Sequence, residues 1–158
     1  MASSEKNLSS YSDKNTAEMV NMRFAVIVSE WNDDITDALY QGVLDTLVEF
    51  GVQKSNIVRK EVPGSFELTL AAQWMAQLSD IDAVICLGCI IKGETKHDEY
   101  IANAVAQGIT HVGLKYDKPV IFGVLTPNTK QQALDRAGGK HGNKGDEAAI
   151  SAIKMLGF

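Results

Sequence analysis

The sequence lacks an excess of positive charge, and it lacks any long apolar run. Fifteen Lys and Arg residues against 20 Asp and Glu residues give a net charge of -5. Proteins that bind nucleic acid backbones or anionic membranes need clustered basic residues, so we predict neither partner. No stretch reaches the 18 or more apolar residues of a membrane span, and residues 1–22 lack the apolar segment of a secretory signal. These absences favour a cytoplasmic protein.

Cysteine is scarce, and its spacing does not favour redox or metal chemistry. Cys86 and Cys89 are the two cysteines, and both lie in the apolar run AVICLGCII. Side chains three residues apart in a strand point to opposite faces, whereas redox CxxC pairs open a helix. We interpret both as small buried hydrophobic residues and expect no disulfide. The three histidines lack metal-ligand spacing, so we predict no metal site.

What the sequence does contain is an alternation of strand and helix patterns after a polar tail of residues 1–22. Short apolar runs rich in β-branched residues predict buried strands at residues 23–30, 56–62, 83–91 and 119–125. Residues 23–158 are long enough for one domain with one core. Strict alternation predicts a doubly wound α/β fold of the flavodoxin-like type. This is a three-layer αβα sandwich around a mainly parallel four-stranded sheet.

Apolar spacing of three and four residues predicts a helix after each strand. Apolar residues 35, 39, 43, 47 and 50 mark one face of the first helix, and Phe66, Leu70 and Trp74 mark one face of the second. The third helix follows residues 93–96, and residues 129–138 and 146–157 predict two more. Four glycines between these last two helices predict a loose or sharply bent junction; they are Gly138, Gly139, Gly142 and Gly145.

Doubly wound sheets bind ligands outside the carboxyl ends of their strands. Four segments are expected on that rim, at residues 29–32, 63–67, 89–97 and 125–127. We therefore predict that these separate stretches of sequence converge on one cleft.

The segment after the third strand is a candidate for anion binding. Gly93, Glu94 and Thr95 precede a helix whose unpaired N–H groups and positive dipole end favour phosphate. The glycines alone are explained better by a tight turn. A nucleotide P-loop is excluded, because Glu94 and Thr95 stand where that motif needs Lys followed by Ser or Thr.

His97 falls in the first turn of the same helix. A lone histidine at a helix start is most often a polar surface residue, but an imidazole beside a bound substrate can take and give protons near neutral pH. Trp31, Glu67 and Arg136 also have two interpretations each. Trp31 is a lid over the core or a stacking platform, Glu67 is a helix-start acid or a hydroxyl acceptor, and Arg136 is a helix-end cation or a phosphate clamp.

Taken together, four segments resemble the 6,7-dimethyl-8-ribityllumazine synthase family. They are VPGSFELTLAA, LGCIIKGETKHDEYIANAVAQGI, KPVIFGVLT and QALDRAGGKHGNKGDEAA, and the match runs in order from about Arg23 to Leu156. The resemblance implies the penultimate enzyme of riboflavin biosynthesis. Such an enzyme joins 5-amino-6-(D-ribitylamino)uracil to 3,4-dihydroxy-2-butanone 4-phosphate, releases phosphate and water, and uses no cofactor.

The same resemblance implies a role for each rim residue. Trp31 stacks on the uracil ring, Glu67 accepts hydrogen bonds from the ribityl chain, and His97 moves the protons. The implied aminouracil-binding residues are Trp31, Asn32, Ser65, Phe66, Glu67, Cys89, Ile90, Ile91, Phe122 and Lys144, and the implied phosphate-binding residues are Gly93, Glu94, Thr95 and Arg136.

The resemblance also implies a homo-oligomer, since Phe122, Arg136 and Lys144 reach the site from a neighbouring subunit in the family. A pentamer is expected, and RAGGKHGNKG lacks the insertion that would forbid an icosahedral shell of sixty subunits. Riboflavin synthase is an implied further partner. The polar tail is expected to lead into a segment that adds to a neighbour's sheet edge.

Two positions depart from the family pattern. Trp31 replaces the usual Phe, and its larger indole suggests that the site also stacks riboflavin. Asp98 replaces a common aromatic residue beside His97, where its charge is expected to alter the local pKa.

Three other functions fit parts of the pattern. A flavin carrier would use Trp31 and the phosphate loop, and would be purified yellow. A purely structural shell protein would have a decayed rim, yet every expected rim position holds a usable residue. A phospho-acceptor domain is suggested by Asp33 and Asp34 but lacks the aspartate required at the end of the third strand.

Overall fold

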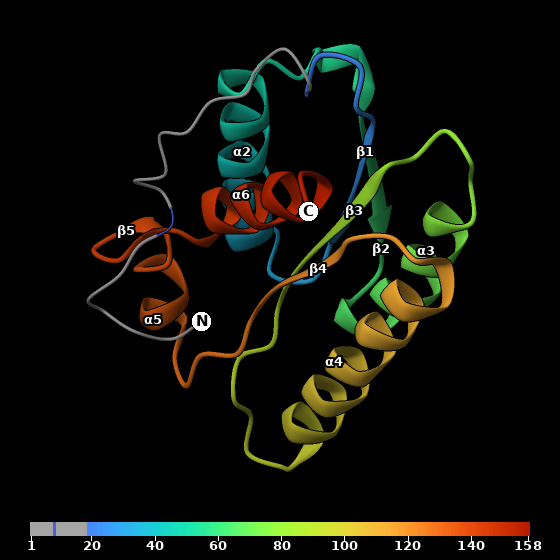
Figure 1. The fold of residues 1–158 in the computed structure, drawn as a ribbon. Coiled ribbons are helices and arrows are strands. Elements are labelled where there is room, and N and C mark those ends of the chain that lie inside the picture. Colours follow the sequence, from blue (N-terminus) through green and yellow to red (C-terminus); the bar gives the residue numbers. More distant parts are fainter. Residues whose placement is uncertain (1–7, 9–18) are drawn as a thin grey trace.

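A computed structural model of the chain describes residue 8 and residues 19–158 (Figure 1). Its main sheet has four parallel strands in the order β2-β1-β3-β4, with β1 at Phe24–Ser29, β2 at Ile57–Val62, β3 at Ala83–Cys89 and β4 at Val120–Leu125. The predicted parallel four-stranded sheet is confirmed. The predictions for the polar tail fall largely on residues 1–7 and 9–18, outside the described residues.

Helices cover both faces of this sheet, which confirms the three-layer sandwich. The core on one face includes residues of α2 (Asp33–Glu49) and α6 (Lys144–Leu156), and the core on the other includes residues of α3 (Leu68–Ala76) and α4 (His97–Tyr116). Figure 1 shows α2 with α6 on one side and α3 with α4 on the other. Within residues 23–158 the other helical elements are short: α5 at Lys130–Leu134 and the 3-10 turns η2 at Lys54–Asn56 and η3 at Ser65–Glu67.

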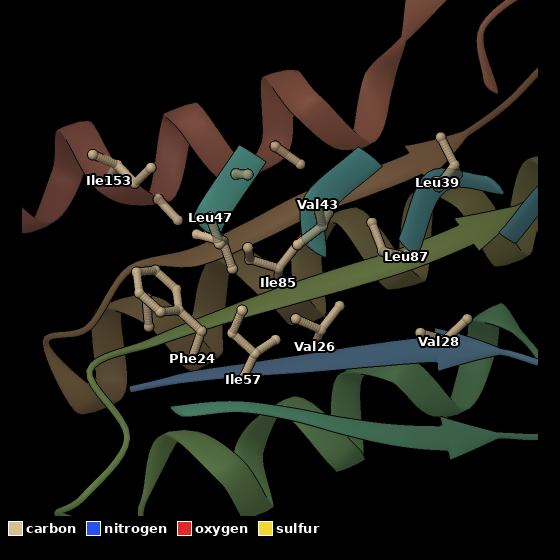
Figure 2. Packing of buried hydrophobic residues seen from close by; sticks show 14 of the residues in the cluster. Phe24, Val26, Val28, Leu39, Val43, Leu47, Ile57, Ile85, Leu87 and Ile153 are labelled. Carbon is tan, nitrogen blue, oxygen red and sulfur yellow. The ribbon is translucent and has the colours of Figure 1, made fainter. Parts of the chain in front are cut away.

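The two central strands are buried on both faces, as their continuous apolar sequences predicted. All six residues of β1 and all seven of β3 are buried. Successive side chains of a strand alternate between faces, so Phe24, Val26 and Val28 pack against α2, whereas Ala25 and Ile27 face α3 and α4 (Figure 2). The sheet is thus held by apolar packing on both of its faces.

The apolar face predicted for the first helix is buried, whereas the one predicted for the second helix is exposed. In α2 the predicted residues, from Ile35 to Leu47, are buried against the sheet, and Phe50 is buried just beyond the helix. The stripe predicted for the second helix begins in η3, at Phe66, and continues in α3, and its residues Phe66, Leu70 and Trp74 are 51–57% exposed. The buried residues of α3 are instead Leu68 and the small residues Ala71, Ala72 and Ala76.

The glycine-rich junction forms a defined hairpin, so of the two predicted alternatives the sharply bent connection is present and the loose one is not. Strands β5 (Ala137–Gly139) and β6 (Gly142–Asn143) pair antiparallel, and Gly142 adopts a positive φ of 72° that favours glycine. Helix α5 also ends at Leu134, four residues earlier than predicted. At the start of α6, a Cβ added to Gly145 would lie 2.0 Å from the Leu39 carbonyl oxygen, so glycine is required there.

In the part of the chain that the structure describes, no helix is both long enough and apolar enough to cross a bilayer.

Candidate active site

Main-chain hydrogen bonds join the segments that leave the strands. Beyond β1 and β2, the Trp31 N–H donates to the Pro63 carbonyl at 3.2 Å. Beyond β3 and β4, the Ile90 N–H donates to the Leu125 carbonyl at 2.8 Å and the Lys92 N–H to the Pro127 carbonyl at 3.0 Å. The four segments expected at the rim therefore lie side by side along the carboxyl ends of the strands.

Asn32 ties the end of β1 to the end of β3. Its backbone is left-handed, with φ of 62°, a conformation that Asn tolerates better than most residues. Its side-chain amide donates to the Cys89 carbonyl at 2.9 Å. Trp31, immediately before it, is 73% exposed. The lid interpretation of Trp31 is therefore wrong, because an indole that covered the core would be buried.

Ser65, Phe66 and Glu67 form the turn η3 between β2 and α3. Ser65 is buried against β3, where a Cβ added to Gly88 would lie only 2.6 Å from Ser65 Oγ. The glycine thus allows the turn to approach the central strand. Phe66 and Glu67 are exposed next to this contact. An aromatic ring and a carboxylate are in this way presented to solvent from a fixed backbone.

The β3 to α4 connection carries the predicted anion loop. Gly93, Glu94 and Thr95 are exposed, and His97 is the first residue of α4. The His97 N–H donates to Thr95 Oγ1 at 3.4 Å, and the Gly93 N–H donates to Asp98 Oδ1 at 3.4 Å. The loop thus lies at the positive end of a 20-residue helix, where an anion is electrostatically favoured.

The last residues of β3 and its continuation offer backbone groups more readily than side chains. Burial raises the pKa of Cys89 to about 11, so its thiol is neutral near pH 7 and is a poor nucleophile. Ile90 is also buried, and Ile91 is partly buried. The Cys89 carbonyl accepts from Asn32, and the Ile90 and Lys92 N–H groups are bonded to the segment beyond β4, so main-chain atoms form the polar edge here and are partly occupied within the chain.

An open cavity of about 310 Å³ lies beside the loop. Its polar lining comes from both sides of the β3 to β4 rim and includes Lys92, Asp98, Glu99, Thr126 and Asn128. Within the described residues, no group of three or more His, Cys, Asp or Glu side chains is arranged to hold a metal ion.

Arg136 and Lys144 come together at the base of the β5–β6 hairpin. The Lys144 N–H donates to the Arg136 carbonyl at 2.8 Å. The Arg136 guanidinium donates to the Gln132 carbonyl at 3.0 Å, and the Lys144 ammonium pairs with Glu147. Arg136 lies two residues beyond the end of α5, so it does not end that helix as predicted.

Phe122 lies away from the strand ends. It is the third residue of β4, pairs with Cys86 in mid-strand, and is 41% exposed. Paired residues of neighbouring strands point to the same face, so Phe122 faces the side of α3 and α4. The structure therefore assembles Trp31, Asn32, Ser65 and Cys89 by direct contacts, while Phe122 stands mid-strand and the Arg136 and Lys144 side chains bond within their own segments.

Two features of the site were missed by the sequence analysis. Glu147 is a buried carboxylate with 6% exposure, and its pairing with Lys144 was signalled by an i,i+3 spacing of opposite charges. The contact of Asp98 with the Gly93 amide had no such signal, because it depends on how the loop folds back over the helix.

Comparison with known proteins adds independent information. The family model described as 6,7-dimethyl-8-ribityllumazine synthase matches residues 21–158. A protein of that name from Cytophaga hutchinsonii is 58% identical over 156 residues, covering 99% of this chain and 98% of the relative. Proteins of the same name from Parabacteroides distasonis and Porphyromonas gingivalis are 50% and 48% identical over 158 residues, covering all of this chain and 99% and 98% of the relatives.

Proposed function

Because this chain belongs to the 6,7-dimethyl-8-ribityllumazine synthase family, we propose that the rim of its sheet is where the family's reaction takes place. The protein is a transferase of riboflavin biosynthesis. It condenses 5-amino-6-(D-ribitylamino)uracil with 3,4-dihydroxy-2-butanone 4-phosphate to give 6,7-dimethyl-8-ribityllumazine, phosphate and water. The observation that carries the proposed location is the convergence of Trp31, Ser65 and Cys89 on one rim.

The aminouracil binds, in this proposal, between the ends of β1, β2 and β3. The exposed Trp31 indole stacks on the pyrimidine ring, and Glu67 accepts hydrogen bonds from the ribityl hydroxyls. Asn32 holds the backbone of this pocket through its bond to Cys89. The remaining members of the pocket are Ser65, Phe66, Ile90 and Ile91.

The phosphate of the second substrate binds at the start of α4. Gly93, Glu94 and Thr95 supply main-chain N–H groups, and Arg136 supplies a guanidinium. A Cβ added to Gly93 would meet no atom within 4 Å, so the loop borders open space that a phosphate can occupy. His97 begins the same helix, and in this proposal its imidazole lies beside the anion.

The chemistry matches these groups. The substrate amine attacks the ketone and an imine forms with loss of one water; phosphate then leaves, and ring closure releases a second water. Each step moves protons, a task that suits His97. Holding two reactive molecules together supplies several kcal/mol of barrier reduction, roughly 7–11 kcal/mol at best, while one general acid–base group adds about 100-fold or more. Proximity is therefore the larger contribution.

We propose that the complete site is shared between subunits of a pentamer. In the single chain, Phe122 lies in mid-strand and is 41% exposed, and the Arg136 guanidinium bonds to the Gln132 carbonyl of its own segment. In this proposal both side chains serve the rim of a neighbouring subunit. The exposed stripe of Phe66, Leu70 and Trp74 supports a subunit interface over η3 and α3, because a row of large exposed apolar side chains marks a contact surface. A neighbouring groove of about 280 Å³ between α3 and α4 continues this apolar surface.

The finer assembly is also a proposal. The short β5–β6 hairpin leaves room for sixty subunits to form an icosahedral shell, with riboflavin synthase as a further partner. The proposed contact of the polar tail with a neighbour's sheet edge, where β2 and β4 are the open edges, falls largely on residues 1–7 and 9–18, outside the described residues. Within the described part of residues 1–22, Met19 is buried in the core of the domain. The enzyme works in the cytoplasm.

The activity is tested by mixing the purified protein with both substrates and following the absorbance and fluorescence of the lumazine product. Absence of product from folded protein would contradict the assignment. The shared site is tested by mixing unfolded His97→Ala and Arg136→Ala variants and refolding them together. If the two residues serve one site from different subunits, roughly a quarter of the sites in mixed oligomers are intact and activity is regained. Activity no higher than the average of the separate variants would refute the sharing.

A further inference from the structure

Asp98 occupies part of the loop that the proposed phosphate needs. It is the second residue of α4, and its carboxylate turns back so that Oδ1 accepts the Gly93 N–H at 3.4 Å. A carboxylate in the first turn of a helix is ordinarily explained by the helix dipole alone. Here the accepted N–H belongs to residue 93, outside the helix and inside the anion loop. The side chain is therefore a ligand of the loop itself.

A phosphate at this loop competes with Asp98 in two ways. It takes up an N–H group that the carboxylate now holds, and it brings a second negative charge close to the first. Opposite effects come from the helix start and from Arg136, which attract the phosphate. The cavity beside the loop is lined by both Asp98 and Lys92, so the carboxylate has space and a cation toward which it can turn when phosphate arrives.

We propose that Asp98 is a specificity-determining residue that weakens phosphate binding at the loop and so limits how tightly the enzyme retains its inorganic phosphate product. The inference rests on the proposed phosphate site at Gly93 to Thr95 and adds to it a residue that opposes binding. It concerns the phosphate half of the reaction only. The pyrimidine pocket, built around Trp31 and Asn32, is not involved.

The experiment uses full-length Asp98→Asn in its native oligomer. Asparagine keeps the size and an acceptor oxygen for the Gly93 amide, but it removes the charge. We measure the KM of each substrate and the inhibition constant of inorganic phosphate against 3,4-dihydroxy-2-butanone 4-phosphate. The expected result is phosphate inhibition about three- to tenfold tighter, a lower KM for the phosphate substrate, and an unchanged KM for the aminouracil.

Glu99→Gln is the matched control. Glu99 lies in the same helical turn and lines the same cavity, so Glu99→Gln changes the net charge by the same amount. The acceptor of the Gly93 N–H is Asp98, so this control leaves that hydrogen bond in place. The effect of Glu99→Gln on phosphate inhibition should be less than about twofold. The difference between the two variants should also shrink at high salt, because exposed charges are screened.

Two results would overturn the inference. In the first, inorganic phosphate inhibits Asp98→Asn with the same constant as it inhibits the unmodified enzyme, while Asp98→Ala binds phosphate more weakly. The carboxylate would then only order the loop. If Glu99→Gln tightens binding as much as Asp98→Asn, the effect belongs to net charge and not to this contact. Arg136→Ala separates this failure from that of the proposed function. If the inhibition constant of phosphate rises in Arg136→Ala, the proposed phosphate site is supported even when the role of Asp98 fails. If the constant changes in neither Arg136→Ala nor Asp98→Asn, both the phosphate site and the role of Asp98 are refuted.

Discussion

Substitution of Trp31 by alanine should separate ligand binding from folding. The indole is 73% exposed, and the residue is held in place by its backbone, through the Trp31 N–H to Pro63 bond and the neighbouring Asn32 to Cys89 bond. When an exposed side chain with few packing contacts is removed, the free energy of unfolding changes by less than about 0.5 kcal/mol. The rim should therefore keep its shape in Trp31→Ala.

Binding of the aminouracil should suffer much more. Stacking of a base on an aromatic side chain contributes about 1–3 kcal/mol, so Trp31→Ala should weaken binding roughly five- to 150-fold. Trp31→Phe retains a stacking ring and should recover most of this loss. The KM of the phosphate substrate should change little, because the indole contacts the other substrate.

Intrinsic fluorescence gives a direct assay, since Trp31 and Trp74 are the two tryptophans. In Trp74→Phe the remaining signal comes from Trp31, and the aminouracil should quench it on stacking. In Trp31→Phe the signal comes from Trp74, and the ligand should leave it nearly unchanged. An Ala variant that binds within twofold of the parent would refute the stacking role. Loss of more than about 2 kcal/mol of stability would show that the indole is packed after all.

The remaining predictions concern protonation and reactivity. His97→Ala should slow lumazine formation about 100-fold or more without abolishing it, because proximity supplies most of the acceleration; total loss of turnover with intact binding would contradict this ranking. Burial raises the pKa of Cys86 to about 12 and of Cys89 to about 11, so iodoacetamide at about pH 8 should modify neither thiol until the protein unfolds, as followed by mass spectrometry. Burial, with repulsion from nearby carboxylates, raises the pKa of Asp146, so its charged form opposes folding above the ordinary Asp pKa. Asp146→Asn should therefore raise the melting temperature at about pH 7, with a gain that shrinks toward about pH 4; a constant gain would point to another cause. A fluorescence titration with riboflavin should give saturable quenching of Trp31, and a flat titration would eliminate the suggested flavin binding.

The strands and most helices were predictable because their apolar spacing reports burial within one chain. Strand limits agreed within one or two residues, and the α2 face was buried as expected. The same spacing failed to report burial in α3. Leu70 and Trp74 obey the helical period yet remain exposed, because periodicity identifies a shared face and not what covers it. An interface between chains leaves the same pattern as a core.

The candidate site was predictable to the level of segments but not of contacts. Parallel strands end together, so the convergence of the segments around Trp31, Ser65 and Cys89 followed from the order of strands and helices. The Asn32 to Cys89 bond spans 57 residues, and the Gly93 to Asp98 bond depends on the path of a loop. No local periodicity encodes either. The hairpin at Gly138 to Asn143 was missed for a related reason, since glycine permits a turn without specifying its pairing.

The rim of this sheet is joined chiefly by main-chain atoms, as in the Trp31 to Pro63, Ile90 to Leu125 and Lys92 to Pro127 bonds. Such bonds persist whichever side chains project from the same positions. Positions 31, 66 and 94 can therefore be varied widely while the scaffold keeps its geometry. A library confined to these exposed positions is a practical starting point for engineering the enzyme toward other diamine and ketone pairs.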